Sequence, residues 1–105
     1  MATLPQDGAM LAEYQRYIML MCQERGFSEQ SIEQKFVKLL EELGELAQAA
    51  AGKAGLSVSR DRTDKISGEV ADVFIVFVDL CNKLEVDIET AVLAKEAKNK
   101  TRSWK

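Results

Sequence analysis

Histidine is absent from this sequence of 105 residues. Without an imidazole the chain cannot form a serine–histidine or cysteine–histidine catalytic pair, and it cannot hold zinc through histidine nitrogen. Any chemistry must therefore depend on carboxylates, amines, hydroxyls or a bound metal ion. Cysteine is also scarce. Cys22 and Cys81 stand alone, without a CxxC spacing, so we expect two buried, reduced thiols rather than a disulfide framework.

Breakers of regular structure are few, with one proline and six glycines. This leaves little room for linkers, and the length suits one domain over residues 1–105. Within it we expect a loose arm over 1–8, a polar basic loop over 52–62 and a short tail over 102–105. Lys53, Arg60 and Arg62 give the loop its charge.

Long apolar runs and a large excess of positive charge are missing too. The formal net charge is −3, which argues against nucleic acid as a partner bound through bulk charge. The apolar runs are too short to span a bilayer, so no membrane partner is expected. The opening MATLPQDGAM lacks the basic and apolar regions of a signal peptide. These features predict a cytoplasmic location.

Helical periodicity of apolar residues predicts helices over 9–25, about 31–51, 64–83 and 87–101. Ser31 with Gln34 forms a capping-box pattern, with Ser28 as the alternative N-cap, and Asp87 is the expected N-cap of the last helix. In the third segment VFIVFV locally favours a strand. The absence of a second strand and the length free of breakers favour a helix. The sum is an all-α four-helix bundle.

Carboxylates gather at two places on these helices. Glu41, Glu42 and Glu45 lie within EELGELAQAA, at spacings that share a helix face. Their repulsion costs only about 0.2–0.5 kcal/mol per pair, so the cluster alone is compatible with a solvated surface. Glu69 and Asp72 are also three apart, but they interrupt a nearly apolar segment. Ionised carboxylates are rarely buried unless they are paired or bind metal.

The second acidic pair belongs to a narrow stripe that faces water, a cation or basic partners: Lys65, Glu69, Asp72, Asp79 and Lys83. One interpretation is a bundle helix with a single wet side. The other is that the second and third helices pack antiparallel, so that Glu42 and Glu45 face Glu69 and Asp72. Four such oxygens would form a ligand set for Mg²⁺ or Mn²⁺ rather than zinc. Magnesium commonly binds together with substrate phosphates, which indicates phosphate chemistry.

The order of these motifs resembles the EExxE…ExxD signature of MazG-like all-α nucleoside triphosphate pyrophosphohydrolases. The flanks agree as well, with KLLEELGELAQA, GEVADVFIVFVDL and AVLAKEAKNKTR in this order over about residues 30–103. The resemblance implies a helical core completed by dimerisation or by a pair of dimers, as a homodimer or homotetramer. It also implies magnesium-dependent hydrolysis of a nucleoside triphosphate to a monophosphate and pyrophosphate, by water attack at the α-phosphorus.

The resemblance further implies roles for individual residues. Glu42, Glu45, Glu69 and Asp72 would be the metal ligands, with Mg²⁺ as the ion and Mn²⁺ as a substitute. Glu41 would be an outer ligand or the base that orients water. The catalytic carboxylates would thus be Glu41, Glu42 and Glu45.

Basic and polar residues near the carboxyl end are candidates for the substrate site. The resemblance places Lys95 and Asn99 there, with Arg102 as a third candidate on the same helix face. An ammonium suits a triphosphate, and an amide can bond to phosphate, sugar or base. The alternative is that these cations simply favour the helix C-terminus. Trp104 either stacks on a nucleobase or covers an apolar edge.

Two rival hypotheses remain open at this stage. A non-enzymatic helical oligomerisation module would use the apolar stripes for assembly and leave the acids as a wet face. A different phosphohydrolase would keep the metal site and cut another bond. A convergent acidic site should be stabilised by divalent metal, whereas a dispersed acidic face should barely respond.

Overall fold

The computed structural model describes residues 2–5, 8–54 and 60–102, with the side chains of 52–54 and 60–64 left out. Four helices follow one another: α1 (Leu11–Glu24), α2 (Ile32–Ala54), α3 (Arg60–Lys83) and α4 (Ile88–Asn99). The described residues contain no strand, so the all-α prediction is confirmed. The ambiguous VFIVFV segment lies in the middle of α3, where it packs on α1 and α2.

The predicted capping residues begin two of the helices. The Ser31 backbone N–H donates to Gln34 Oε1 over 2.8 Å, and the Gln34 N–H donates to Ser31 Oγ over 3.1 Å. This reciprocal pair is the capping box, and it places the start of α2 at Ile32. At α4, the Asp87 carboxylate accepts from the Thr90 N–H over 2.9 Å. Hydrogen bonding to Thr90 lowers the pKa of Asp87.

Two residues with left-handed backbone end the first and third helices. Gly26 follows α1 with a φ of 80°, and the next N–H, that of Phe27, donates to the Cys22 carbonyl. Glu85 follows α3 with a φ of 59°, and the Val86 N–H donates to the Cys81 carbonyl in the same way. Glycine adopts this conformation without strain, whereas a glutamate does not.

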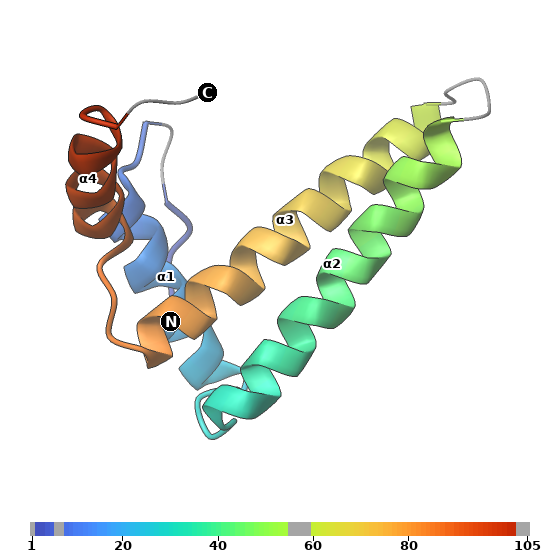
Figure 1. The fold of residues 1–105 in the computed structure, drawn as a ribbon. Coiled ribbons are helices and arrows are strands. Elements are labelled where there is room, and N and C mark those ends of the chain that lie inside the picture. Colours follow the sequence, from blue (N-terminus) through green and yellow to red (C-terminus); the bar gives the residue numbers. More distant parts are fainter. Residues whose placement is uncertain (1, 6–7, 55–59, 103–105) are drawn as a thin grey trace.

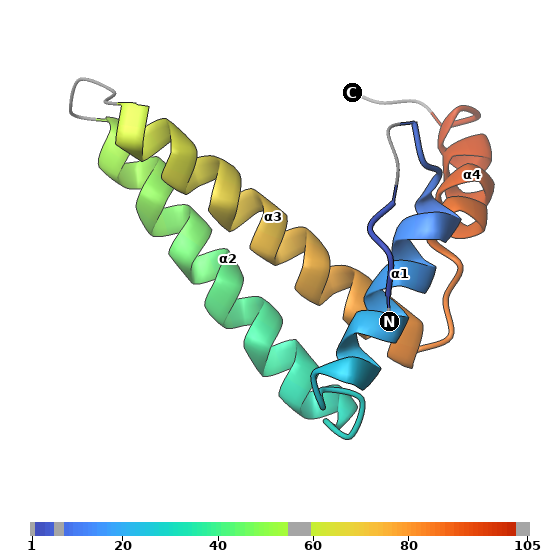
Figure 2. The ribbon, with the colours of Figure 1, turned by 180° about the vertical axis from the view of Figure 1, so that it is seen from behind.

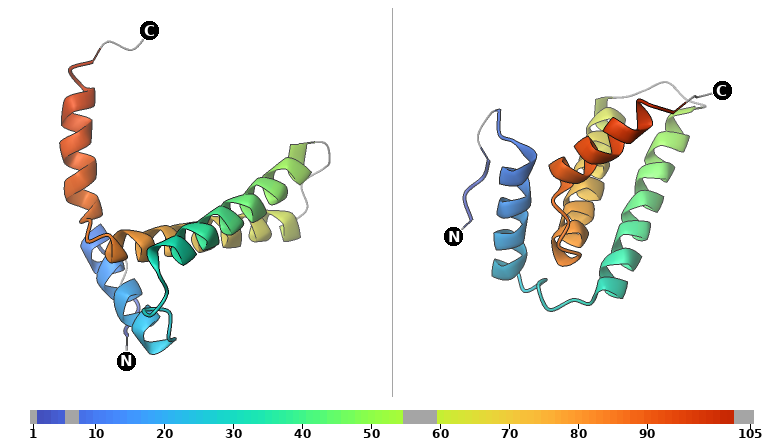
Figure 3. Two further views of the ribbon diagram at one scale, coloured as in Figure 1. Left: turned by 60° about the horizontal axis from the view of Figure 1, so that its bottom comes forward. Right: turned by 60° about the vertical axis from the view of Figure 1, so that its left-hand side comes forward.

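Helices α2 and α3 form a long antiparallel hairpin, and α1 and α4 lie together at its open end (Figure 1). The view from behind shows the same arrangement of the hairpin and the two other helices (Figure 2). Figure 3 shows that α4 leaves the end of α3 and turns away from the hairpin. The Gln15 side chain fixes this corner, because it donates to Asn82 Oδ1 and the Val86 carbonyl and accepts from the Ile88 N–H.

The apolar core is small and sits where α1 crosses α3. It is built from Ile18, Met21, Cys22, Val78, Cys81 and Ile88. The radius of gyration is 16.3 Å, above the roughly 13 Å of a compact domain of this length. The apolar stripe predicted on the second helix is largely uncovered, with Leu40 68% exposed and Phe36 and Leu43 also exposed.

The predicted segment boundaries need two corrections. The loop over 52–62 is shorter than expected, because α2 continues through Gly52 to Ala54 and α3 already begins at Arg60. The arm over 1–8 is not loose at its described start, since the Ala2 N–H donates to Glu24 Oε1 and Ala2 packs against the core. No described helix is long and apolar enough to cross a membrane.

Candidate active site

The antiparallel register of α2 and α3 brings the two acidic motifs together. One carboxylate oxygen from each of Glu42, Glu69 and Asp72 lies within 4.8 Å of the others. The two helices run antiparallel, so moving three residues forward along α2 corresponds to moving three residues back along α3. Glu42 is therefore at the level of Asp72, and Glu45 is at the level of Glu69. The predicted facing of the EExxE and ExxD halves is therefore observed for Glu42, Glu69 and Asp72.

Burial separates this cluster from an ordinary wet face. Glu42 is only 7% exposed, and Glu69 is half-buried. Oε2 of Glu42 and Oε2 of Glu69 are buried without a hydrogen-bond partner among the described residues. Orphaned buried oxygens are costly unless a cation satisfies them. An all-oxygen donor set of this kind fits a hard divalent ion better than zinc.

Glu45 lies at the edge of the cluster rather than within the group of three converging residues. Hydrogen bonding to the Glu42 carboxylate and the negative charges of Glu42 and Glu69 raise the pKa of Glu45. The side chain is exposed, so water moderates this interaction. Glu45 therefore lies close enough to Glu42 and Glu69 for both carboxylates to affect its pKa.

Glu41 is exposed on α2, and its charge acts on Lys38. Lys38 itself was missed in the sequence. Its Nζ lies 3.1 Å from Oε1 of Glu42, one helical turn further along α2. Hydrogen bonding to Glu42 and its charge raise the pKa of Lys38. The i, i+4 spacing in KLLEE was the signal that could have revealed this pair.

The carboxylates open into a cavity of about 240 Å³ between α1, α2 and α3. Glu42, Lys38 and Asp72 line one part of it, and Phe27, Lys35 and Asp79 line another. Burial, together with the nearby Asp79 carboxylate, raises the pKa of the Cys22 thiol to about 11. The same cavity is therefore lined both by the acidic residues Glu42 and Asp72 and by a second charged pair, Lys35 and Asp79.

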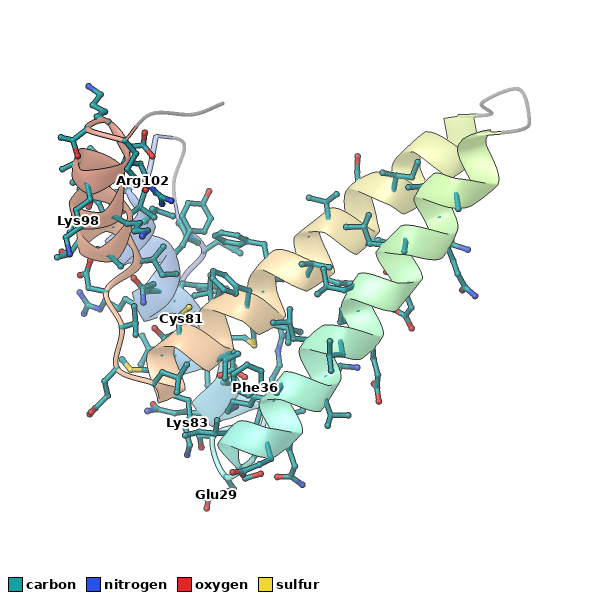
Figure 4. All side chains as sticks on the ribbon, in the orientation of Figure 1. Glu29, Phe36, Cys81, Lys83, Lys98 and Arg102 are labelled. Atoms are coloured by element: carbon teal, nitrogen blue, oxygen red, sulfur yellow. The ribbon has the colours of Figure 1, made fainter. Side chains whose placement is uncertain are left out.

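The predicted substrate residues on α4 are not brought to the carboxylates within this chain. Lys95, Asn99 and Arg102 lie on or just after α4, which packs on α1. Figure 4 shows Lys98 on this helix and Arg102 just after it, away from the hairpin of α2 and α3. Trp104 falls outside the described residues, as do the side chains of Lys53, Arg60 and Arg62.

Comparisons with known proteins agree with this geometry. The MazG nucleotide pyrophosphohydrolase domain matches residues 30–105. The dATP/dGTP diphosphohydrolase of cyanophage S-2L is 44% identical over 68 residues, which are 64% of this chain and 52% of that protein. The chain therefore spans about half the length of this relative.

The solved structures include a cyanophage S-2L MazG-like pyrophosphohydrolase bound to dGDP and three catalytic Mn²⁺ ions per active site. Its fold matches with a TM-score of 0.69 at 35% identity, over 92% of this chain and 87% of that one.

Proposed function

Because the chain belongs to the MazG nucleotide pyrophosphohydrolase domain family, we propose that it hydrolyses nucleoside triphosphates to monophosphates and pyrophosphate. The observation that carries this proposal is the convergence of Glu42, Glu69 and Asp72 around two orphaned buried oxygens. A dispersed wet face, as in a non-enzymatic module, would not bury carboxylates in this way.

Glu42, Glu69 and Asp72 would hold the divalent ion, and Glu45 would join them from the edge of the cluster. We propose Mg²⁺ as the ion, with Mn²⁺ as a substitute. When bound, it would neutralise phosphate charge and lower the barrier to water attack at the α-phosphorus. Glu41 is exposed one residue from Glu42, and it would accept a proton from the attacking water or orient that water.

Lys38 is placed to contribute charge at the phosphate end. In this structure its ammonium pairs with Glu42, and its side chain is otherwise 54% exposed, so it is free to turn toward a neighbouring phosphate. An ammonium binds phosphate as a point charge. The cavity that continues from the carboxylates would then receive the nucleoside.

A second copy of the chain would complete the site. The open shape and the exposed apolar side chains on α2 and α4, including Leu40 and Leu93, favour a homodimer or homotetramer over a monomer. We propose that α4 of one protomer covers the hairpin of another and thereby carries Lys95, Asn99 and Arg102 to its phosphates. Trp104 would follow the same path, and the four helices of each chain would act as one domain.

The test is product analysis with a panel of canonical and modified nucleoside triphosphates in the presence of Mg²⁺. We expect monophosphate and pyrophosphate in equal amounts. With isotopically labelled water the label is expected in the monophosphate, because attack occurs at the α-phosphorus.

The Glu42→Gln variant should lose at least roughly 100-fold in rate, since even residues that only support metal ligands contribute 10- to 100-fold. Glu29→Gln, an exposed residue far from the cluster, serves as the matched control. A folded wild-type protein that releases pyrophosphate from no nucleotide would overturn the proposal.

A further inference from the structure

A buried ion pair lies in the same cavity as the acidic cluster, further along the hairpin. Nζ of Lys35 lies 2.6 Å from Oδ2 of Asp79 and also donates to the Phe27 carbonyl over 3.0 Å. The Lys35 side chain is 2% exposed, whereas the Asp79 side chain keeps 16% of its surface accessible. The lysine is thus fully enclosed, and the carboxylate is the member of the pair that a ligand can reach.

The register of the hairpin fixes how far this pair lies from the metal-binding carboxylates. Lys35 precedes Glu42 by seven residues on α2, and Asp79 follows Asp72 by seven residues on α3. Seven residues of α-helix rise about 10 Å. Both pairs line one cavity, so it has an acidic end at Glu42 and Asp72 and a second end at Lys35 and Asp79, about 10 Å away.

The chemistry of the two ends orients a nucleotide. Phosphates must lie at the end where a cation can neutralise them, because the Asp79 carboxylate would repel them. The nucleoside then extends toward Asp79, and a separation of about 10 Å reaches past the sugar to the base. Phe27 and Ile75 supply apolar wall on the way, so an aromatic base finds partners for its faces.

A carboxylate offers only acceptors, so it pairs with donor groups of a base. We propose that Asp79, positioned by Lys35, selects the substrate by accepting a hydrogen bond from an exocyclic amino group of the nucleobase. Lys35 holds the carboxylate in place and supplies its counter-charge. This inference rests on the proposed function and deepens it, because it assigns a selecting residue to the nucleoside end of the same cavity.

The experiment compares nucleotides that differ by one amino group. Values of kcat/KM are measured with Mg²⁺ for dGTP against deoxyinosine triphosphate, and for dATP against the purine deoxynucleotide that lacks the 6-amino group. In at least one pair, loss of the amino group should lower kcat/KM by roughly 10- to 100-fold, the range for a hydrogen bond to a charged acceptor. If neither pair differs by more than about threefold in an active wild-type enzyme, the inference is wrong.

The same comparison in a variant attributes the preference to Asp79. Lys35→Met/Asp79→Leu removes the acceptor without leaving a buried lone charge, and the ratio should collapse toward one. A ratio of two substrates does not depend on the fraction of folded enzyme, so reduced stability does not mimic the result. Asp79→Asn, which keeps the size of the side chain and should weaken the preference, is the second variant if the double variant does not fold.

Glu89→Gln, exposed on α4, is the matched control and should keep the wild-type ratio. A wild-type ratio that persists in both folded Asp79 variants would overturn the inference while leaving the proposed function intact. Absence of pyrophosphate release from every nucleotide would instead overturn the proposed function, so the two failures are distinguishable.

Discussion

Nζ of Lys35, near the start of α2, lies 2.6 Å from Oδ2 of Asp79, near the end of α3. The same ammonium donates to the carbonyl of Phe27 in the connection between α1 and α2. One enclosed cation therefore joins three parts of the chain at the open end of the hairpin. Breaking a buried pair on one side leaves an uncompensated charge, which is far more costly than losing a surface contact.

We expect Asp79→Leu to lower the free energy of unfolding by about 3–5 kcal/mol, because it leaves Lys35 buried without its partner. Lys35→Met/Asp79→Leu should recover most of this loss, since apolar replacement of both partners is often close to neutral. Urea unfolding at fixed protein concentration measures both.

Lys83→Met is the control, because the exposed Lys83 contacts the Ser28 carbonyl of the same connection over 3.5 Å and should change stability by less than about 0.5 kcal/mol. If the single Asp79→Leu variant is no less stable than this control, Asp79 is not the partner that compensates the buried charge of Lys35.

Local features of the fold could be predicted from the sequence. The helix starts at Ser31 and Asp87 depend on hydrogen bonds to residues only three positions away. The VFIVFV segment is helical, as its length free of breakers predicted, although its residues favour a strand. The spacing of the EExxE and ExxD motifs likewise predicted the facing acids, because an antiparallel hairpin needs only one register to align them.

Contacts between distant elements could not be predicted in the same way. Lys35 and Asp79 are 44 residues apart, and nothing local to Lys35 shows that its charge is enclosed. Asp79 was placed correctly on the polar stripe of the third segment, but its partner was not foreseen. The position of α4 depends on Gln15, whose side chain bonds to residues 67 to 73 positions away. Periodicity carries no information on such long-range contacts.

The left-handed backbone at Glu85 predicts a stabilising substitution. A residue with a Cβ atom is strained at a φ of 59°, by about 1–2 kcal/mol, whereas glycine is not. Glycine also costs more backbone entropy, so Glu85→Gly should raise the free energy of unfolding by about 0.5–1 kcal/mol. Glu85→Ala keeps the strain and should show no such gain. Equal stabilities of the two variants in urea unfolding would show that the strain is not relieved there.

The acidic cluster predicts a specific response to divalent ions. Addition of Mg²⁺ or Mn²⁺ without nucleotide should raise the melting temperature by several degrees, because binding to the folded state at 100 times Kd adds about 2.7 kcal/mol. Glu69→Gln should raise the melting temperature of the metal-free protein, since it relieves repulsion, and should abolish most of the metal response. Glu29→Gln should respond as the wild type does.

The response to metal should also depend on pH through Glu45. Hydrogen bonding to Glu42, and then the charges of Glu42 and Glu69, raise the pKa of Glu45, so its proton is retained at a higher pH in the folded protein than in the unfolded chain. Stability from this protonation is present below the ordinary pKa and is lost as pH rises through the raised value. Metal must compete with that proton, so the melting shift should be smaller at acidic than at neutral pH. A shift that is equal at both would contradict a site built from these carboxylates.

The enclosed Cys22 thiol predicts a loss of stability in alkali. Burial, then the charge of Asp79, raises the pKa of Cys22 from an ordinary value of 9.0 to about 11. A raised pKa in the folded state stabilises it fully below pH 9, and this stabilisation is lost as pH rises from about 9 toward 11. The free energy of unfolding should therefore fall over this range by up to about 2 kcal/mol more in the wild type than in Cys22→Ala.

Cys81→Ala is the comparison for this thiol, because burial raises the pKa of Cys81, whereas the Asp79 carboxylate also acts on Cys22. Cys81→Ala retains Cys22, so its alkaline loss should exceed that of Cys22→Ala and fall below that of the wild type, which has both thiols. Parallel curves for the wild type and Cys22→Ala would show that the Cys22 thiol ionises as easily in the folded protein as in the unfolded chain. Such a result would also contradict the effect of the neighbouring Asp79 carboxylate on the pKa of Cys22.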